Sequence, residues 1–233
     1  METLDIQRYE LKYLINRADA HALANRLKYA LKPDPHSIPY KGYFVRSLYF
    51  DSFDNECFFD KLAGNEKRKK YRLRIYDPDA KHVKFEIKHK YNNQIFKETS
   101  VIGRETALEL MKGDYSVLLD YGDPVLNKIY TVFTGKKYAP CVMVEYYRDA
   151  YVFELFNTRI TIDRKLESSR SDLDLFAPRL HTLPVFWEQK EILEIKYNSF
   201  MPVYIKRLLQ LDAFERQAVS KYTLARRYFM RSI

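Results

Sequence analysis

The stretch that decides the fold is residues 70–76, which read KYRLRIY. In it, Arg72 and Arg74 alternate with aliphatic and aromatic residues. Successive side chains of a β-strand point to opposite faces, so this strand would have one cationic face and one apolar face. Two guanidinium groups on one face can each bind neighbouring phosphate oxygens through paired hydrogen bonds. One such pair is also typical of a solvated edge strand, so its meaning depends on whether the pattern recurs.

The same alternation of charged with apolar residues recurs in other strand-like segments. The charged members on one face are Glu10 and Lys12, then Lys84, Glu86, Lys88 and Lys90, then Glu194 and Lys196. Lys97 follows the second of these segments after a short turn. Any one of these faces could be a solvated surface, but several together could close into a barrel lined by Arg, Lys and a few Glu. That lining would suit a polyphosphate ligand with a metal ion.

Length, composition and segment spacing indicate the fold class. The 233 residues suffice for one large domain or two small ones, and 46% hydrophobic residues support a sizeable core. Hairpin-length connections and the lack of a Gly/Ser linker favour a single domain over residues 1–233. The predicted fold is α+β, with a closed antiparallel β-barrel decorated with helices.

Periodicity and breaker residues predict the elements along the chain. Asn16 is the expected N-cap of the first helix, and Gly113 and Gly135 are expected helix stops. The strands are predicted at 8–15, 43–50, 70–76, 82–90, 94–102, 141–149, 150–155, 158–163 and 190–197. The helices are predicted at 16–31, 56–62, 104–112, 124–133, 202–210 and 213–229.

The charge balance predicts an anionic partner. The net charge is +9, which is typical of proteins that bind nucleic acid, a membrane surface or a phosphorylated small molecule. Because the cations alternate within strands and do not lie in tails, we expect a small phosphate ligand and no nucleic acid. Cys57 and Cys141 suggest reduced thiols and no disulfide framework. No signal core or bilayer-spanning stretch is evident, so we expect a cytoplasmic protein, and a membrane-bound partner protein stays open.

Several further residues are candidates for chemistry. Arg148 shares a strand face with Tyr146, and Arg159, Thr161 and Asp163 share another. A tyrosine in such a strand is more often core than ligand. Glu194 could be an ion-pair partner of the cations or a ligand for Mg²⁺ or Mn²⁺. Phosphate-binding glycine loops, zinc-type histidine clusters and nucleophile-elbow motifs are absent from the sequence, so side chains would hold the phosphates.

Taken in order, these segments resemble the VTC domain, the catalytic domain of vacuolar transporter chaperone polyphosphate polymerases. That domain belongs to the triphosphate tunnel metalloenzyme superfamily, which is similar to the CYTH group. The match covers nearly the whole chain, and the order and spacing of its motifs make it specific. The matching stretches are RYELKYLI at 8–15, SLYFDS at 47–52, KYRLRIY at 70–76, FEIKHK at 85–90, FKETS at 96–100, VEYYRDAY at 144–151, RITID at 159–163, LEIKY at 193–197 and VSKY at 219–222.

The resemblance implies a closed barrel whose tunnel binds a triphosphate, and it implies roles for individual residues. Glu194 would hold the divalent metal, Mn²⁺ or Mg²⁺. The expected phosphate contacts are Lys12, Arg72, Arg74, Lys88, Lys97, Arg148 and Lys221, supported by Tyr146, Arg159 and Ser220. Among these, the expected catalytic residues are Lys12, Arg72, Arg74, Arg148 and Lys221.

The expected reaction transfers the γ-phosphoryl group of ATP onto a polyphosphate chain. The alternatives are a metal-dependent inorganic or organic triphosphatase and a non-catalytic module that binds polyphosphate or nucleic acid. One departure bears on the choice. Hydrolytic members of the superfamily typically open with ExExK, whereas this chain has Arg8 in the first Glu position, before Glu10 and Lys12. Losing a carboxylate removes a potential metal ligand, so the substitution favours transfer over hydrolysis, unless Arg8 pairs with another carboxylate.

Overall fold

A computed structural model describes residues 8–35, 42–92, 94–154, 157–186 and 188–230. The chain divides into two compact units, which are described separately. Unit 1 comprises residues 1–44, 146–166 and 186–220, and unit 2 comprises 45–145, 167–185 and 221–233. Three strands run from one unit into the other, so the prediction of a single domain stays a prediction.

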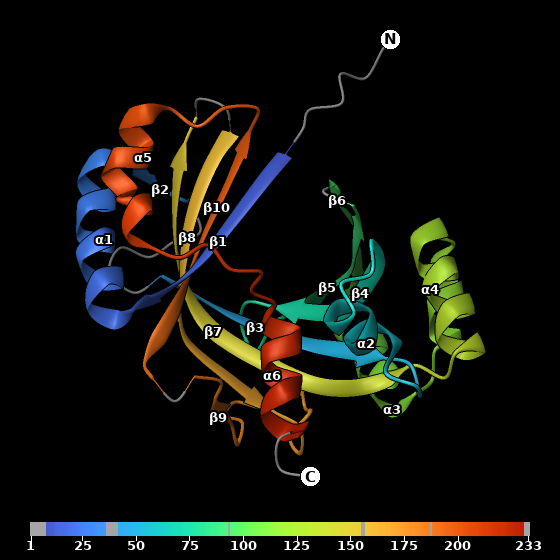
Figure 1. Cartoon of the computed structure of the whole chain (residues 1–233). Coiled ribbons are helices and arrows are strands. Elements are labelled where there is room, and N and C mark those ends of the chain that lie inside the picture. Colours follow the sequence, from blue (N-terminus) through green and yellow to red (C-terminus); the bar gives the residue numbers. More distant parts are fainter. Residues whose placement is uncertain (1–7, 36–41, 93, 155–156, 187, 231–233) are drawn as a thin grey trace. The chain divides into compact units, whose positions relative to one another are not determined.

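The described fold is α+β, as predicted, with antiparallel strands and short helices (Figure 1). The strands are β1 (Arg8–Asn16), β2 (Lys32–Pro33), β3 (Tyr43–Asp51), β4 (Lys67–Ile75), β5 (His82–Tyr91), β6 (Gln94–Gly103), β7 (Ala139–Phe153), β8 (Thr158–Ser169), β9 (Leu183–Pro184) and β10 (Lys190–Asn198). The helices are α1 (Arg17–Ala30), α2 (Glu56–Leu62), α3 (Arg104–Lys112), α4 (Pro124–Gly135), α5 (Val203–Leu209) and α6 (Lys221–Met230), with 3-10 helices η1 (Ser116–Tyr121) and η3 (Leu211–Ala213).

The strand order departs from the predicted closed barrel. Hydrogen-bonded neighbours follow the order β1-β10-β8-β7-β3-β4-β5-β6, with β2 beside β7 and β9 beside β8. Within the described ranges, β1 and β6 are the ends of this order, and no strand pairing joins them. Both end strands carry charged side chains, among them Lys12 on β1 and Lys97 on β6, as is typical of open sheet edges. The sheet is therefore large and antiparallel, but its hydrogen bonding does not close.

In unit 1, one face of β1, β10 and β8 packs on helices. α1 begins at the predicted cap, where the side chain of Asn16 accepts a hydrogen bond of 2.8 Å from the amide of Asp19. Leu23 and Leu27 of α1 are buried, and α1 lies against α5 and the neighbouring strands (Figure 1). The opposite face of these strands is left for the charged residues, because side chains alternate along each strand.

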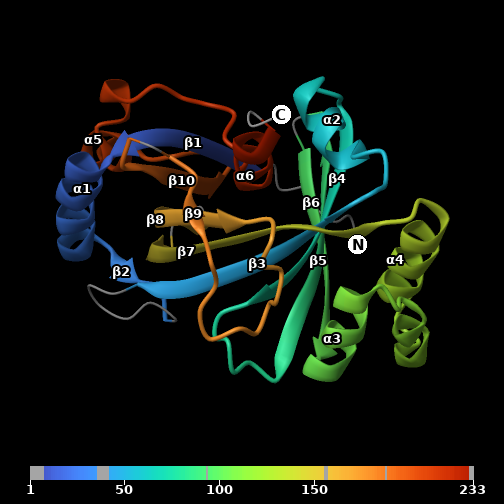
Figure 2. The ribbon, with the colours of Figure 1, turned by 90° about the horizontal axis from the view of Figure 1, so that it is seen from below.

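In unit 2, β3, β4, β5 and β6 form an antiparallel run whose core is aromatic. The ring of Phe133 on α4 lies 4.8–5.7 Å from the rings of Phe50, Tyr71, Phe85 and Tyr138. α3 contacts β5 and β6, α4 contacts β6, and α2 contacts β4 (Figure 2). These contacts cover the apolar face of the strands and leave the face of Arg72 to polar side chains.

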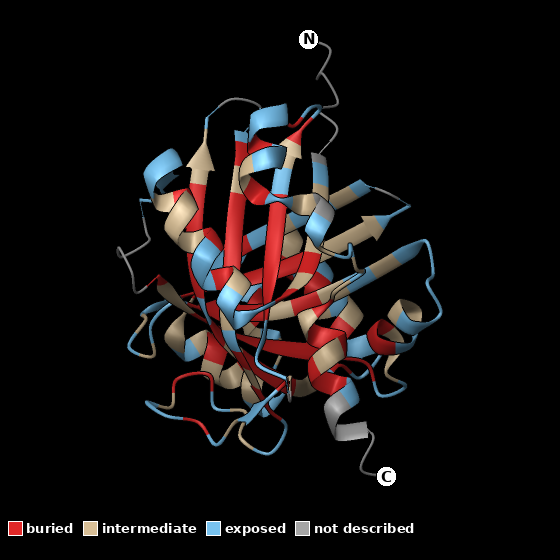
Figure 3. Cartoon of the chain, turned by 60° about the vertical axis from the view of Figure 1, so that its left-hand side comes forward, coloured by how far each residue is buried: buried red, intermediate tan, exposed pale blue. Residues whose placement is uncertain are grey.

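Burial confirms the alternation that the sequence predicts. Tyr71, Leu73 and Ile75 of β4 are buried, whereas Arg72 between them is only partly so. Figure 3 shows the buried residues concentrated along the strands, with exposed residues on the outer faces of the helices. Arg74 is also buried. Its guanidinium can be buried because it lies beside the polar partners described below.

Three predicted elements are wrong. The separate strands at 141–149 and 150–155 are one strand, β7, because no turn residue interrupts the segment. The helix predicted at 213–229 begins only at Lys221. The backbone before it pairs with β1 instead: Arg216 bridges to Tyr13, and the amide of Gln217 donates to the carbonyl of Lys12 at 2.9 Å. Because these backbone groups bond to β1, they are not available for helical hydrogen bonds, and the helix starts later than predicted.

Two smaller expectations can be checked directly. Cys57 and Cys141 are free thiols, as expected. None of the helices in the described part of the chain is long and apolar enough to cross a membrane.

Candidate functional site

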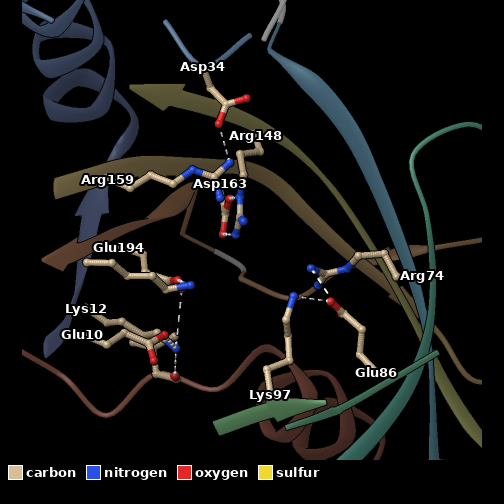
Figure 4. A network of polar contacts seen from close by, with 12 residues as sticks. Glu10, Lys12, Asp34, Arg74, Glu86, Lys97, Arg148, Arg159, Asp163 and Glu194 are labelled. Carbon is tan, nitrogen blue, oxygen red and sulfur yellow. Dashed lines mark hydrogen bonds and ion pairs between the residues drawn. The ribbon is translucent and has the colours of Figure 1, made fainter. Parts of the chain in front are cut away.

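Six of the candidate site residues lie in two polar clusters, one in each unit, and Figure 4 labels members of both. We name them the Glu86 cluster and the Lys12 cluster. The Glu86 cluster in unit 2 consists of Arg72, Arg74, Glu86 and Lys97. The Lys12 cluster in unit 1 consists of Glu10, Lys12, Arg148, Asp163, Glu194 and Lys196.

The Glu86 cluster is a single carboxylate that holds three cations. Arg72 Nε donates to Glu86 Oε2 at 2.7 Å, and Lys97 Nζ donates to Oε1 at 3.0 Å. Arg74 Nη1 lies 3.7 Å from Oε2. This arrangement follows from register, because Arg72 is directly opposite Glu86 on the neighbouring strand. Three positive charges therefore meet one negative charge on the polar face of β4, β5 and β6.

The electrostatics of Glu86 confirm how cationic its surroundings are. Glu86 is only 2% exposed, and burial acts to raise its pKa. Arg72, Arg74 and Lys97 outweigh burial and hold the pKa well below the usual range of a glutamate. Glu86 is therefore ionised, and the cluster keeps a net positive charge.

Two side chains of β3 support the arginines of this cluster. Tyr49 OH accepts from Arg72 Nη1 at 3.1 Å, and Ser47 Oγ accepts from Arg74 Nε at 3.1 Å. Burial acts to raise the pKa of Tyr49, but Arg72, Arg74 and Lys221 together lower it below its ordinary value. The positive potential of this face thus reaches the start of α6, where Lys221 lies.

The Lys12 cluster places one lysine beside two carboxylates. Lys12 Nζ lies 2.9 Å from Glu10 Oε1 and 3.6 Å from Glu194 Oε2, and Glu194 is directly opposite Lys12 on β10. Lys196 Nζ lies 2.8 Å from the other oxygen of Glu194. Burial acts to lower the pKa of Lys12, but Glu194 and Glu10 outweigh it and raise that pKa well above the usual range. Lys12 is therefore a fixed cation at any physiological pH.

Arg148 adds a second cation to this cluster. Its Nε and Nη2 donate to the two carboxylate oxygens of Asp163 at 2.6 and 2.8 Å. The guanidinium carbon lies 5.3 Å from the ring centroid of Tyr146, two residues earlier on β7. Glu194 also acts electrostatically on Arg148, which links the pair to the lysine. The remaining N–H groups of an arginine held in this way can still donate to a ligand.

Arg159 belongs to unit 1 but makes its own contacts. Its Nη2 lies 2.8 Å from Asp34 Oδ2 and 3.0 Å from Tyr43 OH. Its Nε is buried and has no hydrogen-bond partner among the described residues. In these contacts Arg159 pairs with residues outside the six of the Lys12 cluster.

The remaining predicted residues lie as follows. Lys88 is in register between Lys70 and Lys97 and so shares the face of the Glu86 cluster. Lys221 is the first residue of α6 in unit 2, and Ser220 is buried in unit 1.

The donor set fits a hard divalent cation in composition. Mg²⁺ and Mn²⁺ prefer oxygen ligands and often use one or two protein carboxylates with phosphate oxygens. Glu10 and Glu194 supply two carboxylates beside Lys12. Within the described ranges, no group of three or more His, Cys, Asp or Glu could hold a metal ion by itself. A metal here would therefore depend on phosphate oxygens for the rest of its ligands.

The sequence indicated the cations of the two clusters, but it did not indicate all of the side chains that hold them. The roles of Glu86 and Asp163 as carboxylate partners, and of Ser47 and Tyr49 as supports, were not predicted. The signal was present for Glu86, since it alternates with lysines on the strand that follows Arg72 and Arg74. Asp163 offered no comparable signal, because pairing it with Arg148 requires the register of β7 against β8.

Comparison with known proteins identifies the relatives of this chain. Residues 7–230 match the family model described as VTC domain. A protein from Hippeastrum, named as an adenylyl cyclase with a dominant triphosphatase activity, is similar in structure over 95% of this chain and 96% of its own, with a TM-score of 0.58 and 15% identity. A protein from Bacillus halodurans, named as an adenylate cyclase, is similar over 91% of this chain and 92% of its own, with a TM-score of 0.52 and 12% identity. At these identities the likeness shows a shared fold alone, and no curated protein matches the sequence.

Proposed function

The chain belongs to the VTC domain family, and from this premise we propose that it is a polyphosphate polymerase. In this proposal it transfers the γ-phosphoryl group of ATP onto a growing polyphosphate chain, and its cationic side chains bind the phosphates. The observation that carries the proposal is the Glu86 cluster, where three cations share one ionised carboxylate. Such a net positive face suits a chain of phosphates better than a neutral ligand.

Phosphoryl transfer needs little covalent help from a protein, and catalysis depends on positioning and on charge stabilisation. In our proposal, Arg72, Arg74 and Arg148 stabilise the charge on the transferring phosphoryl group. A guanidinium that is already fixed by Glu86 or Asp163 needs no rearrangement to do so. Catalysis by Lys221 belongs to the same proposal.

The lysines would hold the flanking phosphates. Lys12, Lys88 and Lys97 are compact point charges, each able to contact one or two phosphate oxygens. Tyr146, Arg159 and Ser220 would support these contacts.

The proposal includes one divalent metal, Mn²⁺ or Mg²⁺, held by Glu194 with phosphate oxygens. When bound, such an ion would neutralise charge on the phosphates as a Lewis acid. Lys12 and Lys196 flank Glu194 and would hold its carboxylate in place. Glu10 is the second carboxylate available to the same ion.

The proposed ligands are ATP and polyphosphate, and nucleic acid is not among them. A cytoplasmic location, where ATP is abundant, is consistent with the reaction. A membrane protein that receives the polymer remains part of the proposal as a partner.

A triphosphatase is the second candidate. The pair of carboxylates beside Lys12 could support metal-assisted attack of water, and the similar structure from Hippeastrum is named for a triphosphatase activity. A binding module that consumes no ATP is the third.

Incubating the purified protein with ATP and Mn²⁺ or Mg²⁺ distinguishes the candidates, with products resolved by gel and ³¹P NMR. A polyphosphate ladder with ADP supports the polymerase. Orthophosphate without polymer supports the hydrolase, and bound polyphosphate without ATP consumption supports the binding module. Arg72→Ala and Lys12→Ala should each lose most activity. Lys112→Ala, an exposed lysine on α3, is the matched control and should keep it.

A further inference from the structure

Three alternating side chains of β3 reach toward the cations of unit 2. Ser47 Oγ accepts from Arg74 Nε, and Tyr49 OH accepts from Arg72 Nη1, each at 3.1 Å. Two residues further along, Asp51 Oδ2 accepts a short hydrogen bond from Tyr222 OH. One strand therefore contacts two candidate phosphate ligands and the residue next to a third, Lys221.

Register explains why the first two contacts form. Ser47 is directly opposite Arg74, and Tyr49 is directly opposite Arg72, in the antiparallel pairing of β3 with β4. Directly opposite residues share a face and lie close enough for their side chains to touch. Arg72 is thus held on one side by Tyr49 and on the other by Glu86. A guanidinium fixed at two points loses rotamer freedom before any ligand arrives.

The third contact fixes the start of α6. Asp51 is buried, and it also accepts from the amides of Ser52, Cys57 and Phe58 at 2.9, 2.8 and 3.2 Å. This carboxylate is therefore immobilised by backbone donors around the start of α2. Tyr222, which it binds, is the second residue of α6.

A second link holds the same helix. Arg226, one turn after Tyr222, donates to the side chain of Asn55, the residue before α2, in a short hydrogen bond. The first turn of α6, and with it the backbone of Lys221, is thus held relative to β3 and α2.

Contacts of aromatic rings connect Tyr49 on β3 with Tyr222 on α6. The rings of Tyr49 and Tyr222 lie 5.2 Å apart between centroids, tilted by 38°. Lys70 Nζ lies 5.6 Å from the centroid of the Tyr222 ring. Arg72 Nη1 donates to the Tyr49 hydroxyl, and Arg72, Arg74 and Lys221 all act to lower the pKa of Tyr49. A shift of either ring would therefore change the surroundings of more than one cation.

We propose that Ser47, Tyr49 and Asp51 form a positioning row, which orients Arg74, Arg72 and Lys221 for consecutive phosphates of one polyanion. These three are positioning residues and not catalytic residues, because each acts through another side chain. The inference rests on the proposed function, since it takes the three cations as phosphate ligands. It adds a cause for their alignment: a single strand with a two-residue period sets all three.

The test is a double-mutant cycle on tripolyphosphate binding, measured by isothermal titration calorimetry at low ionic strength. Tyr49→Phe removes one hydroxyl and keeps the ring, so packing is preserved. We expect it to weaken binding roughly 3- to 10-fold, the range for one lost hydrogen bond. In an Arg72→Ala background the same substitution should have no effect, because the residue through which it acts is gone. A merely structural role would give the same loss in both backgrounds.

Ser47→Ala paired with Arg74→Ala, and Tyr222→Phe paired with Lys221→Ala, repeat the cycle for the rest of the row. Ser47→Ala is the safeguard if a tyrosine variant fails to fold. Tyr29→Phe, on an exposed tyrosine of α1, is the matched control and should bind like wild type. Equal losses with and without the partner cation would overturn the positioning row and leave the proposed function standing. A wild-type protein that does not bind tripolyphosphate would overturn both.

Discussion

Arg148 and Asp163 form a two-point ion pair, with Nε and Nη2 donating to the two carboxylate oxygens at 2.6 and 2.8 Å. Asp163 is fully buried at 0% exposure, and Arg148 is 8% exposed. A charge that is buried to this extent requires a partner, because the free energy lost on leaving water is offset only by a close opposite charge. The pair therefore orders a candidate phosphate ligand at the cost of making the fold depend on both residues.

Asp163→Ala should destabilise the protein by about 3–5 kcal/mol, the usual cost of removing one partner of a buried pair. The measurement is urea denaturation at pH 7. Glu109→Ala is the control, because its ion pair with Lys112 is exposed and worth at most about 1 kcal/mol. An Asp163 variant as stable as the control would mean that the pair contributes little to folding.

Glu86→Gln should flatten the acid limb of the stability curve. Three cations hold the folded-state pKa of Glu86 well below 4.5, so its contribution is full above the unfolded pKa and is lost as pH falls below it. Below pH 4.5 the free energy of unfolding of the wild type should fall as pH falls. Its slope should exceed that of the variant by the equivalent of up to one bound proton. Chemical denaturation at several pH values measures both slopes. Parallel curves would contradict the role given to Glu86.

Glu191 should give the opposite dependence. Burial raises its pKa to about 7, and Asp149 adds to this, while Arg164 and Arg17 act against it. Its Oε2 has no hydrogen-bond partner among the described residues. The folded state therefore binds a proton between about pH 4.5 and 7 that the unfolded state releases, and stability falls as pH rises through this window.

Glu191→Gln should remove that fall and be more stable than wild type at pH 8. Thermal unfolding at pH 5 and pH 8 tests it, with Glu109→Gln as the surface control. A variant whose unfolding temperature depends on pH as steeply as wild type would contradict the prediction.

Glu194→Gln should weaken metal binding, so that any ATP-consuming activity needs a higher metal concentration. The carboxylate that we assign to Mn²⁺ or Mg²⁺ becomes a neutral amide, a poorer ligand for a hard cation. The measurement is activity against metal concentration, starting from protein treated with a chelator. A right-shifted metal curve is expected. A curve like that of wild type would remove Glu194 from the metal site.

Gly42→Ala should distort the backbone beside Arg148. Gly42 has φ +67°, and a Cβ there would lie 2.4 Å from the carbonyl oxygen of Arg148 and 2.6 Å from a carboxylate oxygen of Asp149. The left-handed conformation alone costs on the order of 1–3 kcal/mol for another residue. We expect a lower unfolding temperature and weaker tripolyphosphate binding. Gly64→Ala, also at positive φ but with nothing near its Cβ, separates strain from collision.

Much of the fold was predictable because it depends on short-range periodicity. The bounds of α2 and α3 match the sequence prediction, since a hydrophobic period and nearby breakers define each helix. The prediction failed where distant backbone competes, as at Gln217, whose amide pairs with Lys12 on β1. Barrel closure likewise could not be predicted, because it depends on hydrogen bonds between strands from opposite ends of the sheet order.

The sequence by itself determined which residues are cationic and which face of each strand they share, because a strand has a period of two and burial of one face selects the other. It therefore indicated Arg72, Arg74 and Lys12 as a group. Only the tertiary structure decided which carboxylate each cation meets. Arg72 and Glu86 are separated by 14 residues and Lys12 and Glu194 by 182, and strand register alone brings such pairs within ion-pair distance.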